Sequence, residues 1–219
     1  MERQPPSAVR VWDLPTRLFH WALALLVVAS WVSGQFGGVD WLPWHFRSGY
    51  LIFALLLFRL LWGFAGDRYA LFSSFRLSPS RALAHLREPQ RVAGHSPAGA
   101  WSVYALLLCV GFQVITGLLS SDGDFTEGPW AQFVSERTVR LMSSVHTVNR
   151  WVLAALVAAH VAAIAWYRWK RGVALTAAMW TGTMHGVVAE SATDDRKIRL
   201  RAALLAAWAG VLVAYVVLL

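Results

Sequence analysis

The chain has little of what a soluble or disulfide-stabilised domain needs. Only 15% of its 219 residues are charged, and Cys109 is the only cysteine, which excludes an intramolecular disulfide. The sequence contains no internal repeat and no low-complexity tract. The formal net charge is +8, but the basic residues flank apolar segments instead of forming one long soluble patch, so no nucleic-acid partner is expected.

Apolar residues dominate instead, at 57% of the chain. They gather in five segments at residues 14–34, 44–64, 99–119, 145–167 and 200–219, each close to the about 20 helical residues that cross a bilayer core. Tryptophans stand near the segment ends, where indole rings favour the headgroup level. The pattern predicts an all-α, multi-pass membrane protein.

The charges in the connections predict an orientation. The connections after the first and third segments hold acidic residues such as Asp40, Asp122 and Glu136, whereas the amino terminus and the second and fourth connections collect Arg and Lys. The positive-inside rule then places the amino terminus in the cytoplasm and the carboxyl terminus outside. Within the second connection, Ser78-Pro79 before residues 81–86 predicts a short, capped amphipathic helix.

Four histidines lie in or at the rim of the apolar segments, where polar groups are costly and usually functional. His146 and His160 are fourteen residues apart, so they return to within about 40° of one helix face, about 21 Å apart along its axis. His20 lies near the start of the first segment, and His45 opens the second. Depth alone pairs His20 with His160 at the inner level and His45 with His146 at the outer level.

Two separated pairs favour bis-histidine haem. Zinc usually takes three or four protein ligands at one site, whereas iron in a porphyrin needs two axial ligands. A zinc site and a histidine-lined proton path stay open as alternatives. The chain has no C-x-x-C-H motif, so any haem is held by axial ligands and packing. The loop histidines His85, His95 and His185 are expected to be solvated.

Glycines and arginines extend the candidate site. Gly49 in the second segment and Gly111 and Gly117 in the third could make room for a macrocycle, although close helix packing explains such glycines equally well. Arg17, Arg59 and Arg150 lie within reach of the histidine levels and could pair with haem propionates. For Arg17 and Arg59, snorkelling to lipid phosphate is the alternative.

Several of these motifs together resemble the bacterial cytochrome b561 and nickel-iron hydrogenase b-type cytochrome superfamily. They are VWDLPTRLFHW at residues 11–21, the stretch from His45 through Gly49 to Arg59 and Trp62, GHSPAGA at residues 94–100, and the pair His146 and His160. The resemblance covers about the first 170 residues. It implies a four-helix transmembrane bundle with two b haems, ligated by His20, His45, His146 and His160.

The resemblance also implies a function. Electrons would pass between the quinone pool and a periplasmic redox partner such as a c-type cytochrome or a hydrogenase, in the bacterial inner membrane. Alternatives are a superoxide:quinone oxidoreductase and a membrane anchor subunit, and a homodimer is left open.

Two features depart from the family pattern. Thr147 stands where many members carry an acidic residue, and the fifth segment lies outside the four-helix core. We therefore expect a dihaem domain at residues 1–170, followed at residues 171–219 by a cytoplasmic connection and an accessory transmembrane helix.

Overall fold

The computed structural model describes residues 8–36, 38–75, 77–88, 90–123 and 126–218. Its helices are α1 (Leu14–Phe36), α2 (Gly38–Ala65), α3 (Pro79–Arg87), α4 (Pro97–Leu118), α5 (Glu136–Arg171), α6 (Leu175–Thr181) and α7 (Arg196–Leu218). Two short strands, β1 (Val9–Arg10) and β2 (Thr183–Met184), and 3-10 turns at Phe72–Ser74 and Ala131–Phe133 complete the described elements.

Five of these helices, α1, α2, α4, α5 and α7, are long and apolar enough to cross a membrane. Large apolar side chains on them stay exposed, for example Leu25 at 71%, Leu108 at 71% and Val211 at 71%. Lipid tails tolerate such faces, which water would not. The prediction of an all-α membrane protein with five long helices is confirmed.

Four helices begin earlier than the hydropathy pattern predicts, and the difference is largest for α2 and α5. Helix α2 starts at Gly38 instead of residue 44, and α5 starts at Glu136 instead of residue 145. Asp40 and Glu136 stand in the first turns, where acidic residues favour the helix dipole. Hydropathy marks only the apolar part of a helix, so these polar first turns were missed. His45 consequently lies inside α2 and does not open it.

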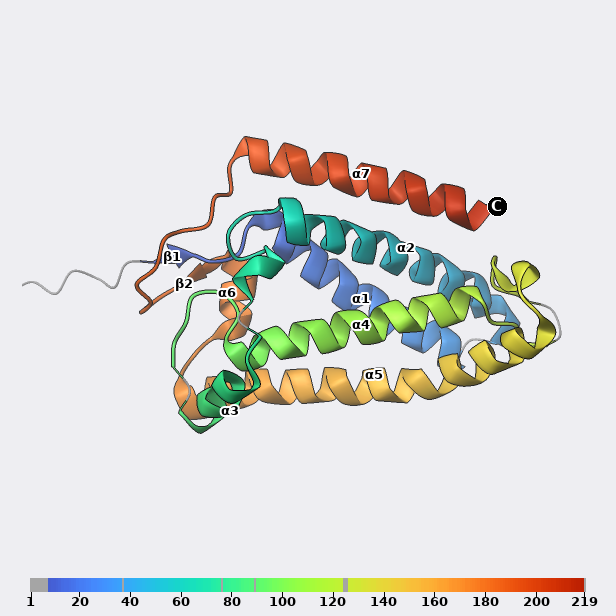
Figure 1. Cartoon of the computed structure of the whole chain (residues 1–219), viewed down its shortest axis with the longest axis horizontal. Helices are drawn as coiled ribbons and strands as arrows, with labels where there is room; N and C mark the ends of the chain where they lie inside the picture. Colours follow the sequence, from blue (N-terminus) through green and yellow to red (C-terminus); the bar gives the residue numbers. More distant parts are fainter. Residues whose placement is uncertain (1–7, 37, 76, 89, 124–125, 219) are drawn as a thin grey trace, which may run out of the picture. The chain divides into compact units, whose positions relative to one another are not determined.

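The chain forms two compact units. The first unit contains Met1–His20, Arg59–Tyr104 and Ala159–Leu205. In it β1 pairs antiparallel with β2, with Val9 opposite Met184, and α6 lies beside this ribbon (Figure 1). The ribbon belongs to a buried cluster made by Val9, Val11, Trp12, Ala178, Met184 and Val187. The cluster joins the residues before α1 to the connection after α5.

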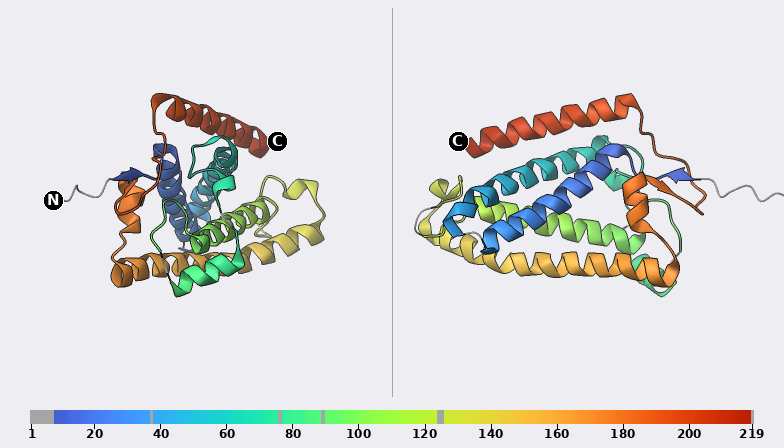
Figure 2. Two further views of the ribbon diagram at one scale, coloured as in Figure 1. Left: turned by 60° about the vertical axis from the view of Figure 1, so that its left-hand side comes forward. Right: turned by 180° about the vertical axis from the view of Figure 1, so that it is seen from behind.

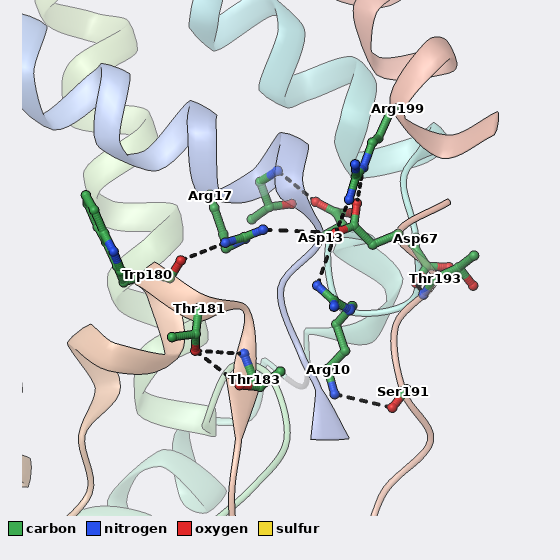
Figure 3. Close-up of polar contacts among 12 residues, drawn as sticks. Arg10, Asp13, Arg17, Asp67, Trp180, Thr181, Thr183, Ser191, Thr193 and Arg199 are labelled. Atoms are coloured by element: carbon green, nitrogen blue, oxygen red, sulfur yellow. Dashed lines mark hydrogen bonds and ion pairs between the residues drawn. The ribbon is translucent and has the colours of Figure 1, made fainter. Parts of the chain in front are cut away.

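Gly182 and Asp194 stabilise the chain segments around this cluster. Gly182 has φ +86° and accepts bonds from the amides of Val11 and Trp12, and an added Cβ would lie 2.7 Å from the Trp12 carbonyl oxygen. Arg10 and Arg199, both labelled in Figure 3, bind the Asp194 side chain at 3.1 and 3.0 Å. That side chain is 2% exposed. Burial would raise the pKa of Asp194, but its hydrogen bonds and the arginine charges prevail and hold it below the usual value.

The predicted amphipathic helix is confirmed as α3. Ser78 caps it by accepting a bond from the Arg81 amide, and Pro79 stands in its first turn. His85 on this helix is only 7% exposed, and its Nε2 lies 2.8 Å from the Tyr167 hydroxyl. The expectation that His85 is solvated was wrong, because the helix turns this ring toward α5. His185 is exposed, as expected.

The second unit contains Trp21–Phe58, Ala105–Ala158 and Ala206–Leu219. Its core brings together α2, α4 and α5 through Ile52, Leu56, Cys109, Val110 and Leu153, with partly buried leucines of α1 packed against them. The return from α4 to α5, drawn in yellow, folds against the start of α5 (Figure 2), where Ser143 bonds both backbone groups of Ser121. Trp130 in this return donates to the Val216 carbonyl of α7.

Candidate functional site

A cavity of about 270 Å³ in the second unit contains one of the two predicted histidine pairs. His45 from α2 and His146 from α5 line it, with ring centres 6.1 Å apart and planes at 90°. Gly49, Gly117 and Arg150, all predicted from the sequence to take part in the site, also line it. Helices remote in sequence thus meet at one cavity.

Backbone carbonyls orient both rings of this pair. Nδ1 of His45 lies 2.9 Å from the Ser30 carbonyl oxygen of α1. Nδ1 of His146 lies 3.0 Å from the Gln113 carbonyl oxygen of α4. A carbonyl can only accept, so the hydrogen-bond pattern assigns the proton to Nδ1 in both rings. Each Nε2 then keeps a lone pair for a metal, the arrangement that supports histidine ligands.

Two glycines make room for the rings. A Cβ at Gly117 would lie 2.9 Å from Cε1 of His146, and a Cβ at Gly34 would lie 2.8 Å from Nδ1 of His45. Gly34 is the last residue of the first predicted apolar segment and lies within α1. An added Cβ would meet nothing within 4 Å at either Gly49 or Gly111. Gly49 lines the cavity, whereas Gly111 does not.

The first unit contains the other predicted pair. His20 of α1 and His160 of α5 have ring centres 6.4 Å apart and planes at 48°. Their partly buried side chains stand among apolar helices. The structure therefore brings together His20 with His160 and His45 with His146, each pair within one unit.

In the same unit as His20 and His160, Arg59 is a buried cation, 3% exposed. Its guanidinium lies 4.6 Å from the ring centre of Phe72, and Nη1 has no hydrogen-bond partner among the described residues. A buried charge of this kind is costly unless an anion compensates it. The buried Asp13 carboxylate attracts this guanidinium, and the unbonded Nη1 leaves a donor for a second carboxylate. A side chain this deeply buried does not snorkel to lipid.

His95 stands in the same surroundings, between Trp12 at 4.7 Å and Phe75 at 4.4 Å. Burial, and then the charges of Arg59 and His20, lower the pKa of His95 to about 3. Its Nδ1 is buried and unbonded within the described part of the chain. The expectation that His95 is solvated was wrong: the turn at residues 94–96 folds the ring inward against the aromatic residues.

The other two predicted arginines have different surroundings. Arg17 donates to the Trp180 carbonyl oxygen at 2.6 Å and lies 4.0 Å from Asp194, so it serves at least to hold the connection after α5 (Figure 3). Arg150 lines the cavity, lies 5.4 Å from the ring centre of Trp151, and has a buried Nε without a partner among the described residues. Arg150 is thus available to an anionic ligand.

Sequence reasoning missed the polar residues around His146. Gln113 and Asn149 form a hydrogen-bonded group with it, and Thr116 Oγ1 lies 3.2 Å from its Nδ1. Ser30 and Gly34, which serve His45, were missed as well. The available signal was the amide side chain of Gln113 inside an otherwise apolar segment, since such groups in a membrane are usually functional.

The four histidines fit haem better than a metal ion held by protein alone. In the described residues no three His, Cys, Asp or Glu side chains gather at a distance that would hold a metal. Two imidazoles on opposite sides of a metal, each with nitrogen about 2 Å from it, place their ring centres roughly 6 Å apart. The observed 6.1 and 6.4 Å match that spacing. The ligand role of each histidine stays a prediction.

Comparison with known proteins identifies the family of the chain. The family described as prokaryotic cytochrome b561 matches residues 11–182. The probable Ni/Fe-hydrogenase B-type cytochrome subunit of Azotobacter chroococcum mcd 1 is 26% identical over 193 residues, covering 71% of this chain and 79% of that protein. The probable Ni/Fe-hydrogenase 1 B-type cytochrome subunit of Escherichia coli (strain K12) is 24% identical, covering 69% and 80%. No solved structure matches the chain.

The family match spans more than half of the chain and includes all four histidines. Together with the five long apolar helices, it identifies a multi-pass membrane protein. The chain belongs to the prokaryotic cytochrome b561 family and is a membrane-embedded b-type cytochrome that binds haem b and transfers electrons.

Proposed function

We propose that this cytochrome holds two haem b groups and carries electrons across the bacterial inner membrane between the quinone pool and a periplasmic redox partner. His20 and His160 are the axial ligands of the inner haem, and His45 and His146 those of the outer haem. The observation that carries the proposal is the matching separation of the rings within each pair, 6.4 and 6.1 Å. The remaining candidate residues serve these two sites.

The histidines determine the kind of chemistry. When bound, haem b would supply a one-electron couple, and the two histidines of each pair would hold its iron and exclude oxygen and substrate from it. His45 and His146 hold their Nδ1 protons on carbonyl oxygens, which raises the basicity of the ligating nitrogens. Arg59 offers an unused donor to a carboxylate at the inner site, and Arg150 does so at the outer site.

The route of the electrons follows from the expected orientation. Helix α5 carries both His146 and His160, so one helix serves both levels. With the amino terminus in the cytoplasm, quinol gives up electrons and protons at one face, and a soluble protein takes single electrons outside. The hydrogenase subunits among the relatives support a hydrogenase as that partner, with a c-type cytochrome as the alternative.

Two further parts of the proposal concern organisation. Residues 1–170 form the dihaem domain, and residues 171–219 add a cytoplasmic connection and an accessory membrane helix. The bonds of Trp130 to Val216 and of Arg201 to Ala65 support a role of α7 in bracing neighbouring segments within each unit.

A redox titration of the purified protein tests the proposal. We expect a reduced-minus-oxidised b-type spectrum, two haems per chain and two separable midpoint potentials. His160→Ala and His45→Ala should each remove one haem and one midpoint, whereas His185→Ala, which changes an exposed loop histidine, should remove neither. One haem in the unchanged protein, or two haems retained in both ligand variants, would contradict the assignment.

A second measurement addresses the partner. Electron transfer from quinol should require an added periplasmic acceptor protein. Reduction of quinone by superoxide without any protein partner would instead favour a superoxide:quinone oxidoreductase. Normal assembly with a partner in variants that lack both haems, and unchanged electron transfer by that complex, would indicate an anchor subunit.

A further inference from the structure

A buried amide of α5 bonds α4 next to the outer histidine. Asn149 is 8% exposed and lies three residues after His146, on the same side of the helix. Its side-chain nitrogen donates to the Cys109 carbonyl oxygen at 3.2 Å and to Oε1 of Gln113 at 2.7 Å. Its oxygen accepts from the Cys109 thiol at 3.4 Å. All of its hydrogen-bonding groups thus point to one neighbouring helix.

Gln113 extends this bonding to the histidine. Its side-chain nitrogen donates to the His146 carbonyl oxygen at 3.1 Å, and its own carbonyl oxygen receives the Nδ1 proton of His146 at 3.0 Å. The same amide nitrogen lies 3.2 Å from Nε2 of His146. Ligation of a metal by Nε2 ends that contact alone, because the amide keeps its bonds to His146 and Asn149. The group therefore tolerates a bound haem.

The cost of such a group inside a membrane indicates a use beyond packing. Amide side chains in an apolar bundle cost free energy unless they are fully bonded, and here they are bonded to one another and to the ligand. Asn149 does not line the cavity, so it acts on a ligand only through Gln113 and His146. Leucine or valine would pack the two helices without this cost.

We propose that Asn149 is a positioning residue for the outer haem ligand. By fixing α5 against α4 through Gln113, it keeps Nδ1 of His146 on the Gln113 carbonyl and thereby sets the potential of the haem that His146 ligates. The proposal rests on the proposed function, because it needs His146 as a ligand. A carbonyl acceptor at Nδ1 gives the ring anionic character, which favours ferric iron and lowers the midpoint potential.

Asn149→Leu is the direct test, read by redox titration and by the electron paramagnetic resonance spectrum of the oxidised protein. We expect two haems per chain, a rise of one midpoint, no change in the other, and altered g values for the shifted haem only. Gln113→Met, which keeps the carbonyl acceptor but removes the side-chain amide through which Asn149 acts, should shift the same midpoint upward at least as far. Asn149→Gln keeps an amide at this position, so its midpoint should lie between that of the unchanged protein and that of Asn149→Leu.

Cys109→Ala is the matched control. It removes a buried side chain from the same group but leaves the backbone carbonyl that Asn149 uses, so it should lower stability without moving either midpoint. Unchanged midpoints in Asn149→Leu with normal haem content would overturn the inference. If Asn149→Leu does not fold, unchanged midpoints in Gln113→Met overturn it equally. Absence of two haems in the unchanged protein would overturn the proposed function instead.

Discussion

Replacing Gly117 by alanine puts the geometry of the outer site to a direct test. The added Cβ would lie 2.9 Å from Cε1 and 3.2 Å from Nδ1 of His146. Carbon atoms favour separations of about 3.5–4.0 Å, so the ring must retreat by roughly 0.6–1.1 Å. It cannot do so freely, because Nδ1 is bonded to the Gln113 carbonyl oxygen at 3.0 Å. The strain therefore falls on the ligand itself.

The magnitude follows from these contacts. Overpacking of a well-filled interior costs about 1–3 kcal/mol, and loss of the Nδ1 bond accounts for about 0.5–1.5 kcal/mol of it. At about 1.4 kcal/mol for each factor of ten, we expect roughly 5- to 150-fold weaker binding of haem at this site. Gly111→Ala on the same helix meets nothing within 4 Å and gains up to about 1 kcal/mol of helix propensity, which makes it the matched control.

The assay is the haem-to-protein ratio of purified variants, together with a redox titration. Gly117→Ala should lose most of one haem, and any outer haem that remains should have a displaced midpoint. Gly111→Ala should resemble the unchanged protein in both measurements. Full haem content and two unmoved midpoints in Gly117→Ala would refute the reasoning, since the ring would then not occupy the space that the glycine leaves.

Three other perturbations have distinct expected outcomes. Arg59→Leu removes a buried cation, so haem at the inner site should bind roughly 10-fold or more weakly and its midpoint should fall, as a redox titration would show. The pKa of His95 is lowered to about 3, so the folded state resists protonation of this ring and the free energy of unfolding falls as pH drops below about 6.5. Thermal unfolding should show a loss of about 2 kcal/mol between pH 6.5 and pH 5. His95→Phe should remove that part of the loss. Asp194→Asn should cost about 1–3 kcal/mol of unfolding free energy, against less than about 0.5 kcal/mol for Glu136→Gln in an exposed pair.

A specific result would contradict each of these three predictions. A raised inner midpoint in Arg59→Leu would show that the guanidinium does not face the haem. An equal loss of stability at low pH with and without His95 would assign that loss to other groups. Equal effects of the Asp194 and Glu136 substitutions would mean that burial adds nothing to the Asp194 ion pairs.

Much of the architecture could be predicted because a bilayer imposes it. A hydrocarbon core requires long apolar helices, and their number and approximate positions follow from hydropathy. The helix ends could not be predicted as well, because the polar first turns at Gly38 and Glu136 do not contribute to an apolar pattern. The ribbon of β1 and β2 escaped prediction altogether, since strands of two residues have no periodicity to detect.

The candidate site, too, could be predicted only in part. The four histidines could be selected because they lie in or at the rim of apolar segments. They could be paired by depth because helix rise converts sequence distance into height. Residues that support them, such as Gly34, Ser30 and Gln113, come from neighbouring helices, and their relevance depends on rotation about each helix axis. His95 shows the limit most clearly, because a loop position suggested solvent whereas the ring is held between Trp12 and Phe75.

By itself, the sequence determined that this protein lies in a membrane, that it carries histidines at two heights, and that it resembles the b-type cytochromes, because length, hydropathy and spacing are properties of the chain along one dimension. Only the tertiary structure decided which atoms meet. It put the Nδ1 atoms of His45 and His146 on carbonyl oxygens of other helices, and it enclosed Arg59 among aromatic rings. Those contacts depend on how helices face one another, which packing sets and hydropathy does not record.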